Sequence, residues 1–174
     1  MAGLGLASRG GAASADDAAL INDLKVAYLY NFTHFIEWPR APAGTHFDIC
    51  VVGAPDLAEA ARALERSDKT VDGRRFLVRP LGPSAPLEGC RMLVMGEGAV
   101  GRLDELVERS AGKPILLVGD APGLARRGAA IGFVLRPDIL GKGGRLRFEI
   151  NPSALKGRGL RVSAQLYDVA EIVQ

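Results

Sequence analysis

Residues 115–118 read Ile-Leu-Leu-Val, and this run decides the fold class of the chain. It predicts a short strand in which no polar residue alternates with the apolar ones. A strand with one face in water alternates, whereas a parallel strand covered on both faces is apolar throughout. The run therefore predicts a parallel sheet with helices on both of its faces.

The rest of the chain alternates strand and helix patterns around this run. Six strands are expected, at residues 47–53, 74–81, 91–95, 115–118, 130–135 and 145–150. Apolar spacings of three and four predict helices at 17–37, 54–66 and 103–110, and Pro39 is expected to stop the first of them. No helix pattern separates the last two strands, so that pair is expected to be antiparallel. We expect an α/β protein: a single-domain sandwich with a mostly parallel sheet of about six strands and helices on both faces.

The composition is that of one globular domain. Of 174 residues, 48% are hydrophobic and 24% charged, and 22 basic residues stand against 20 acidic ones. This balance and the 6% of aromatic residues argue against a nucleic-acid binder. No apolar stretch reaches the roughly 18 residues that a membrane span needs. The spacing of the Cys and His residues suggests no metal site, and no set of nucleophile and base suggests an enzyme.

The N-terminal residues 1–15 differ from the rest, which we treat as one domain at 16–174. They are rich in Gly, Ala and Ser, and residues 13–15 (Ala-Ser-Ala) resemble the small-residue site of a signal peptidase. A basic start and a long apolar segment are missing. Two interpretations stay open: the remnant of an export signal, or a disordered cytoplasmic tail.

A glycine motif suggests nucleotide binding. Residues 96–101 (Gly-Glu-Gly-Ala-Val-Gly) follow a predicted strand and open a helix, and Asp120 closes the next strand. In a dinucleotide-binding unit such glycines admit a pyrophosphate, and an acidic residue binds the ribose. However, the motif follows the third strand instead of the first, and the chain leaves no room for a catalytic domain. A glycine-rich turn is the simpler interpretation, and we expect no cofactor.

Two surfaces are candidates for binding a partner. The first helix carries an apolar face with the aromatic residues Tyr28, Phe32, Phe35 and Trp38, which fits either core packing or a contact surface. Nine basic residues lie between positions 126 and 161, among them Arg147, against two acidic ones. They form either a solvated face or a site for an acidic partner.

Cys50 and Cys90 lie in or beside two predicted strands. If these strands are close, the two sulfurs can form a disulfide, which an exported protein permits. Two buried free thiols are the alternative.

Several segments together resemble a known family. They are LKVAYLYNFTHFIEWP at 24–39, VGD at 118–120 with RGAAIGFV at 127–134, RLRFEIN at 145–151 and GLRVS at 159–163. An aromatic helix that ends in Glu-Trp-Pro, followed far downstream by Arg-Phe-Glu-Ile-Asn, is similar to the YfiR family of bacterial periplasmic proteins. The resemblance covers about residues 20–173.

The resemblance implies export to the periplasm, a compact α/β fold and frequent homodimers. It also implies a function without catalysis, which is to hold a membrane-anchored diguanylate cyclase inactive through its periplasmic domain. Disulfides occur in the family, and Cys50 and Cys90 sit where one is plausible. The connection at residues 136–144 is longer than is usual in the family, and only one disulfide is possible here.

We therefore expect a periplasmic repressor that lowers cyclic di-GMP. Two other functions stay open. One is a module that binds a small molecule at the carboxyl ends of the strands, near Gly53, Gly96 and Gly119. The other is a dinucleotide-dependent enzyme.

Overall fold

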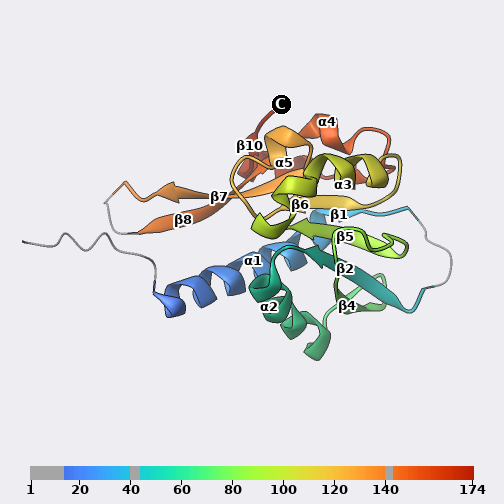
Figure 1. Ribbon diagram of the computed structural model, residues 1–174, viewed down its shortest axis with the longest axis horizontal. Coiled ribbons are helices and arrows are strands. Elements are labelled where there is room, and N and C mark those ends of the chain that lie inside the picture. The colour runs from blue at the N-terminus through green and yellow to red at the C-terminus, as the bar shows by residue number, and fades with distance from the viewer. Residues whose placement is uncertain (1–13, 40–43, 140–142) are drawn as a thin grey trace, which may run out of the picture.

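A computed structural model describes residues 14–39, 44–139 and 143–174 of the chain (Figure 1). Its α-helices are α1 (Ala15–Phe35), α2 (Pro55–Arg66), α3 (Leu103–Ser110), α4 (Pro152–Leu155) and α5 (Ala164–Val169), with short 3-10 helices η1 (Glu97–Arg102) and η2 (Ala125–Arg127). Its strands are β1 (Ile36–Glu37), β2 (His46–Val52), β3 (Thr70–Val71), β4 (Arg74–Pro80), β5 (Cys90–Met95), β6 (Leu116–Gly119), β7 (Ile131–Pro137), β8 (Gly144–Ile150), β9 (Arg161–Val162) and β10 (Glu171–Ile172).

The main sheet has eight strands in the order β10-β8-β7-β6-β5-β2-β4-β3. Its central pairs are parallel, whereas β7 and β8 form the expected antiparallel pair and β3 pairs antiparallel with β4. The predicted mostly parallel α/β sheet is therefore confirmed. All six expected strands are present. The two additional strands, β3 and β10, are two residues long, too short to show any periodicity.

Successive side chains of the central strands point to opposite faces, and each face has its own core. Ile49 and Val51 of β2 belong to the core under α1 and α2. Cys50 and Val52 belong to the core under α3, η1 and η2. The residues of β6 are completely buried, as a strand with helices on both faces requires.

Helix α1 ends two residues earlier than the sequence predicted. Phe35 is its last residue, and Ile36 is already extended, with φ −124° and ψ 129°. Ile36 and Glu37 form β1, which pairs antiparallel with Val162 and Arg161 of β9. Pro39 is therefore not what stops the helix; pairing with a strand 125 positions further along the chain stops it, and local sequence does not reveal such a partner.

The start of α1 falls inside the segment that we separated as residues 1–15. Ser14 is the N-cap: its hydroxyl accepts a hydrogen bond from the Asp17 amide, and the Asp17 carboxylate accepts one from the Ser14 amide. Residues 1–13 of that segment lie outside the described part of the chain. Helix α1 thus begins at its Ser14 cap.

Candidate partner-binding surface

The aromatic residues of α1 face the sheet. The Phe32 ring is completely buried and lies 5.2 Å from the ring of Phe148 and 6.1 Å from that of Phe133, measured between centroids. Tyr28, one turn earlier, lies 5.5 Å from Phe148 and is only half-buried. Phe32 therefore belongs to the core and is not accessible to a partner in this fold, whereas part of the Tyr28 side chain is exposed at the surface.

The end of α1 is also fixed to the sheet. The indole of Trp38 packs edge-on against Phe47, with centroids 4.9 Å apart, and its Nε1 donates a hydrogen bond to the Arg91 carbonyl at 3.0 Å. Phe35 and Trp38 are half-buried against the same core. Of the four aromatic residues, three keep some exposed surface.

The exposed apolar residues of α1 lie at its other end. Leu20 is 59% exposed and Leu24 is 45% exposed, whereas Val26 and Leu29 are buried. The first turns of α1 run past the sheet toward the projecting β7–β8 hairpin, where little covers them (Figure 1).

A shallow hollow joins Leu24 to the hairpin. It has a volume of about 370 Å³ and is lined by Leu24 and Tyr28 of α1 and by Asp138, Gly144, Arg145 and Leu146 of the hairpin. Apolar side chains and one arginine thus meet at one place on the surface. We call Leu20, Leu24, Tyr28 and Arg145 the hairpin-end surface.

A buried ion pair fixes α1 behind this surface. The Lys25 ammonium lies 2.6 Å from Oδ1 of Asp120, and the side chains are 15% and 11% exposed. Burial raises the pKa of Asp120 above its ordinary value, and the ammonium of Lys25 opposes that rise. Asp120, which the glycine motif suggested as a ribose ligand, is therefore occupied by Lys25.

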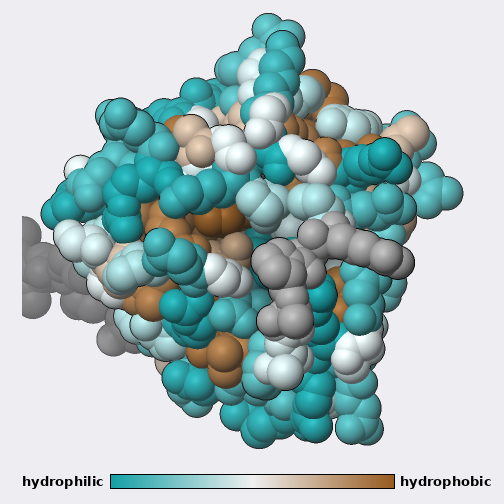
Figure 2. Space-filling view, turned by 90° about the vertical axis from the view of Figure 1, so that its right-hand side faces the viewer, coloured by the Kyte–Doolittle hydropathy of each residue, from teal (hydrophilic) through white to brown (hydrophobic). Residues whose placement is uncertain are grey.

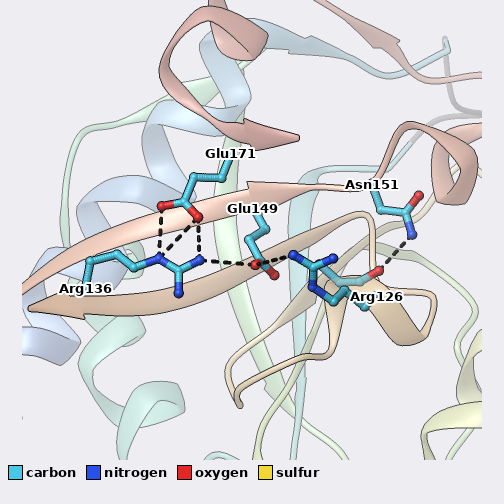
Figure 3. A network of polar contacts seen from close by, with 6 residues as sticks. Arg126, Arg136, Glu149, Asn151 and Glu171 are labelled. Carbon is cyan, nitrogen blue, oxygen red and sulfur yellow. Dashed lines mark hydrogen bonds and ion pairs between the residues drawn. The ribbon is translucent and has the colours of Figure 1, made fainter. Parts of the chain in front are cut away.

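Arg147 alternates with the core residues of β8, so it lies on the opposite side of the strand. Its charge acts on Glu171, which belongs to a network of charges (Figure 3). The side chain of Glu149 in β8 is almost buried. Its Oε1 forms ion pairs with Nη2 of Arg126 at 3.6 Å and with Nη2 of Arg136 at 3.4 Å. Arg136 also binds both carboxylate oxygens of Glu171. Since Glu171 belongs to the edge strand β10, this network attaches β10 to β7 and β8.

The structure does not gather the five predicted contact residues on one surface. Tyr28 is exposed at the hairpin-end surface, whereas Trp38 is exposed at the other end of α1. Arg147 lies on the opposite face of β8, and Phe32 is buried in the core. Leu20, Leu24 and Arg145 were not singled out. No pattern in the sequence separates Leu20 and Leu24 from the buried apolar residues of α1.

Residues 22–171, which include all of these features except Leu20, match the family described as YfiR/HmsC-like. The chain belongs to the YfiR/HmsC-like family. A search among curated proteins finds no match for it.

The segments that resemble this family have clear structural roles. In RFEIN, Phe148 and Ile150 fill the core and Glu149 holds the charge network. The side-chain nitrogen of Asn151 donates to the Ala125 carbonyl at 2.8 Å (Figure 3). Its side-chain oxygen accepts hydrogen bonds from the amides of Ser153 and Ala154 at the start of α4. The YfiR/HmsC-like pattern thus records how β8, η2 and α4 are joined.

The glycine motif of this chain also has a packing role. A Cβ added to Gly96 would lie 2.4 Å from the Gly53 carbonyl oxygen, and one added to Gly53 would lie 2.3 Å from the Ala99 amide nitrogen. The turns after β2 and β5 therefore touch each other, and η1 follows as a 3-10 helix. A Cβ on Gly119 would likewise meet Leu124 at 2.4 Å. The glycines allow close backbone packing between these turns.

Cys50 and Cys90 are bonded in the structure, with their Cα atoms 5.7 Å apart. They join β2 to its neighbour β5 inside the core under α3. Among the described residues, no group of three or more His, Cys, Asp or Glu side chains is arranged to hold a metal ion. No helix in that part of the chain has the length and apolarity for crossing a membrane.

Proposed function

We propose that this protein is a periplasmic regulator that binds the periplasmic domain of a membrane-anchored diguanylate cyclase and holds the enzyme inactive. Membership of the YfiR/HmsC-like family over residues 22–171 carries the proposal. The Cys50–Cys90 disulfide supports it, because such bonds persist in oxidising compartments. The role needs no catalysis by this chain.

The mechanism is a shift between two states of the cyclase. The regulator binds the inactive state more tightly than the active one, so its binding draws the population toward the inactive state. Release of the regulator restores cyclic di-GMP synthesis. The size of the effect is set by the ratio of the two affinities.

The hairpin-end surface is our first candidate for the contact. Leu20 and Leu24 are exposed apolar residues, and Arg145 gives the surface a charge at its rim. Central apolar residues with a charged rim are typical of protein interfaces. Arg147 and the neighbouring arginines form the second candidate, for an acidic surface of the partner. Phe35 and Trp38 lie at the other end of α1, so their exposed edges would form a separate contact.

A homodimer is a further part of the proposal, and sedimentation of the purified protein tests it. A dimer that uses the hairpin-end surface would compete with the cyclase for it. Dissociation of the dimer on addition of the cyclase domain would then be measurable in the same experiment.

The first experiment compares cellular cyclic di-GMP in a strain that lacks the gene with its parent. We expect a clear rise in the deletion strain and a return to the parental level when the gene is restored with its export signal. An unchanged level in the deletion strain would contradict the proposed function.

A further inference from the structure

A second cavity lies at the amino ends of the central strands β2, β5 and β6. Its volume is about 690 Å³, within the usual range for small-molecule sites. Its apolar lining includes Leu77, Leu87 and Ile115, together with Cys90 of the disulfide. Figure 2 faces this end of the molecule and shows hydrophobic atoms grouped among hydrophilic ones.

Arg91 is the unusual residue of this cavity. It lines the cavity and is only 8% exposed. Among the described residues, its side chain has neither an ion pair nor a hydrogen bond. Burial and the nearby Arg74 lower the pKa of Arg91, and the carboxylates of Asp48 and Asp72 oppose that shift. The guanidinium nitrogens keep contact with solvent at the cavity, where they are free to bind an anion.

Arg91 lies at an irregularity in the pairing of β5 with β2. Asp48 of β2 pairs with Cys90, and the next residue, Ile49, pairs with Met92, so Arg91 is the extra residue of a bulge in β5. Trp38 binds its carbonyl oxygen. Bulges redirect side chains and are frequent beside functional sites.

The carboxylates of Asp48 and Asp72 act on the Arg91 cation, but neither forms an ion pair with it. Asp48 lines the cavity and is bound by Arg79 at 3.1 Å. Lys113 adds a second cation at the rim, and Glu88 is an exposed carboxylate there. His46 completes the polar part of the wall.

We propose that this cavity binds a small organic carboxylate, with the carboxylate on Arg91 and an apolar body against Leu77, Leu87 and Ile115. An arginine binds a carboxylate through two parallel hydrogen bonds, and the leucines exclude water from the pair. Lys113 attracts the anion at the entrance. The site is separate from the glycine turns at the carboxyl ends of the strands, and the proposal does not depend on the function proposed above.

The test uses the purified, oxidised protein and 3-phenylpropionate as the probe. An NMR titration should show saturable shifts at the amides of Leu77, Leu87 and Ile115. The neutral amide of the same acid, 3-phenylpropionamide, should bind at least about tenfold more weakly, because it lacks the charge that Arg91 needs. Hexanoate tests whether an aliphatic body is accepted equally.

Two variants separate binding from folding. Arg91→Gln should weaken binding of 3-phenylpropionate at least about tenfold. Lys113→Glu changes an exposed residue, so it keeps the fold and should weaken binding even where Arg91→Gln fails to fold. Arg127→Gln, on an exposed arginine of η2, is the control and should bind normally. The proposal is overturned if neither carboxylate gives saturable shifts at these residues, if the amide binds equally well, or if a folded Arg91→Gln or Lys113→Glu variant binds unchanged.

Discussion

Lys25 is expected to stabilise the fold through the carboxylate of Asp120. Its ammonium forms an ion pair with Oδ1 of Asp120, an oxygen that has no hydrogen-bond partner among the described residues. Lys25→Met leaves a buried carboxylate unpaired and should lower the free energy of unfolding by about 3 kcal/mol at neutral pH. Urea unfolding of the variant beside the parent measures this loss.

The pH dependence gives this prediction its control. Burial raises the pKa of Asp120 in the folded state, so its charged form opposes folding, and stability falls as the pH rises through the folded pKa. Removing Lys25 raises that pKa further. The loss in Lys25→Met should therefore shrink between about pH 7 and about pH 4, as Asp120 takes up a proton. The double variant Lys25→Met/Asp120→Leu should recover most of the stability, and an equal loss in both variants would contradict the account.

The Cys50–Cys90 disulfide is also expected to stabilise the fold. Cys50 and Cys90 close a loop with a sequence separation of 40. In the chain-entropy model, Cys50→Ala/Cys90→Ala should lower the free energy of unfolding by up to about 4 kcal/mol. Reduction of the parent protein should give a similar loss in a thermal melt. A double variant as stable as the oxidised parent would show that the bond does not constrain the unfolded chain.

The chemistry of single residues was only partly visible in the sequence. Cys50 and Cys90 were recognised as a possible pair because strands bring distant residues together. Asp120 was noticed for its place after a strand, but its partner Lys25 lies on a helix 95 positions away. Arg91 was not noticed, since a bulge and a missing partner are properties of the folded chain alone.

Among the elements, the edge strand β10 depends most on side chains. It pairs with β8 over only two residues, and Arg136 holds its Glu171. Arg136→Gln should loosen this attachment and speed hydrogen exchange at the Val173 amide, which binds the Ile150 carbonyl at 2.9 Å. Arg145→Gln, in the same hairpin, is the matched control and should leave that exchange rate unchanged.

The same attachment has a pH dependence of opposite sign to that of Asp120. Hydrogen bonding to Arg136 lowers the pKa of Glu171 in the folded state. The ionised Glu171 therefore stabilises the attachment of β10 above the ordinary glutamate pKa. This stabilisation is lost as the pH falls through the lower pKa of the folded state. The protection factor of the Val173 amide, which is the ratio of its intrinsic to its observed exchange rate at the same pH, should therefore fall in acid in the parent and much less in Arg136→Gln. An equal fall in both proteins would remove Glu171 from the explanation.

Long elements were predicted correctly and short ones were not. Strands of four or more residues and helices α2 and α3 stand where apolar periodicity placed them. β1, β3, β9 and β10 are each two residues long and exist because a neighbouring strand supplies hydrogen bonds. The end of α1 was misplaced for the same reason.

The first turns of α1 are exposed, so a substitution there tests contact with a partner without disturbing the packing of the core. Leu24→Asp changes a side chain that is 45% exposed, so the fold should stay intact. If the hairpin-end surface binds the cyclase, this variant should raise cellular cyclic di-GMP to the level of the deletion strain. Binding of the purified variant to the periplasmic domain of the cyclase measures the same loss directly.

Three further variants make this result decisive. Phe32→Asp buries a charge in the core and should unfold the protein, so its loss of repression reports on folding alone. Phe35→Asp keeps its thermal melt only if the ring contributes mainly to contact, and a collapsed melt assigns Phe35 to the core. Arg147→Glu tests the rival surface on the other face of β8. A folded Leu24→Asp variant that represses fully, beside an Arg147→Glu variant that does not, would move the contact from the helix to the arginines.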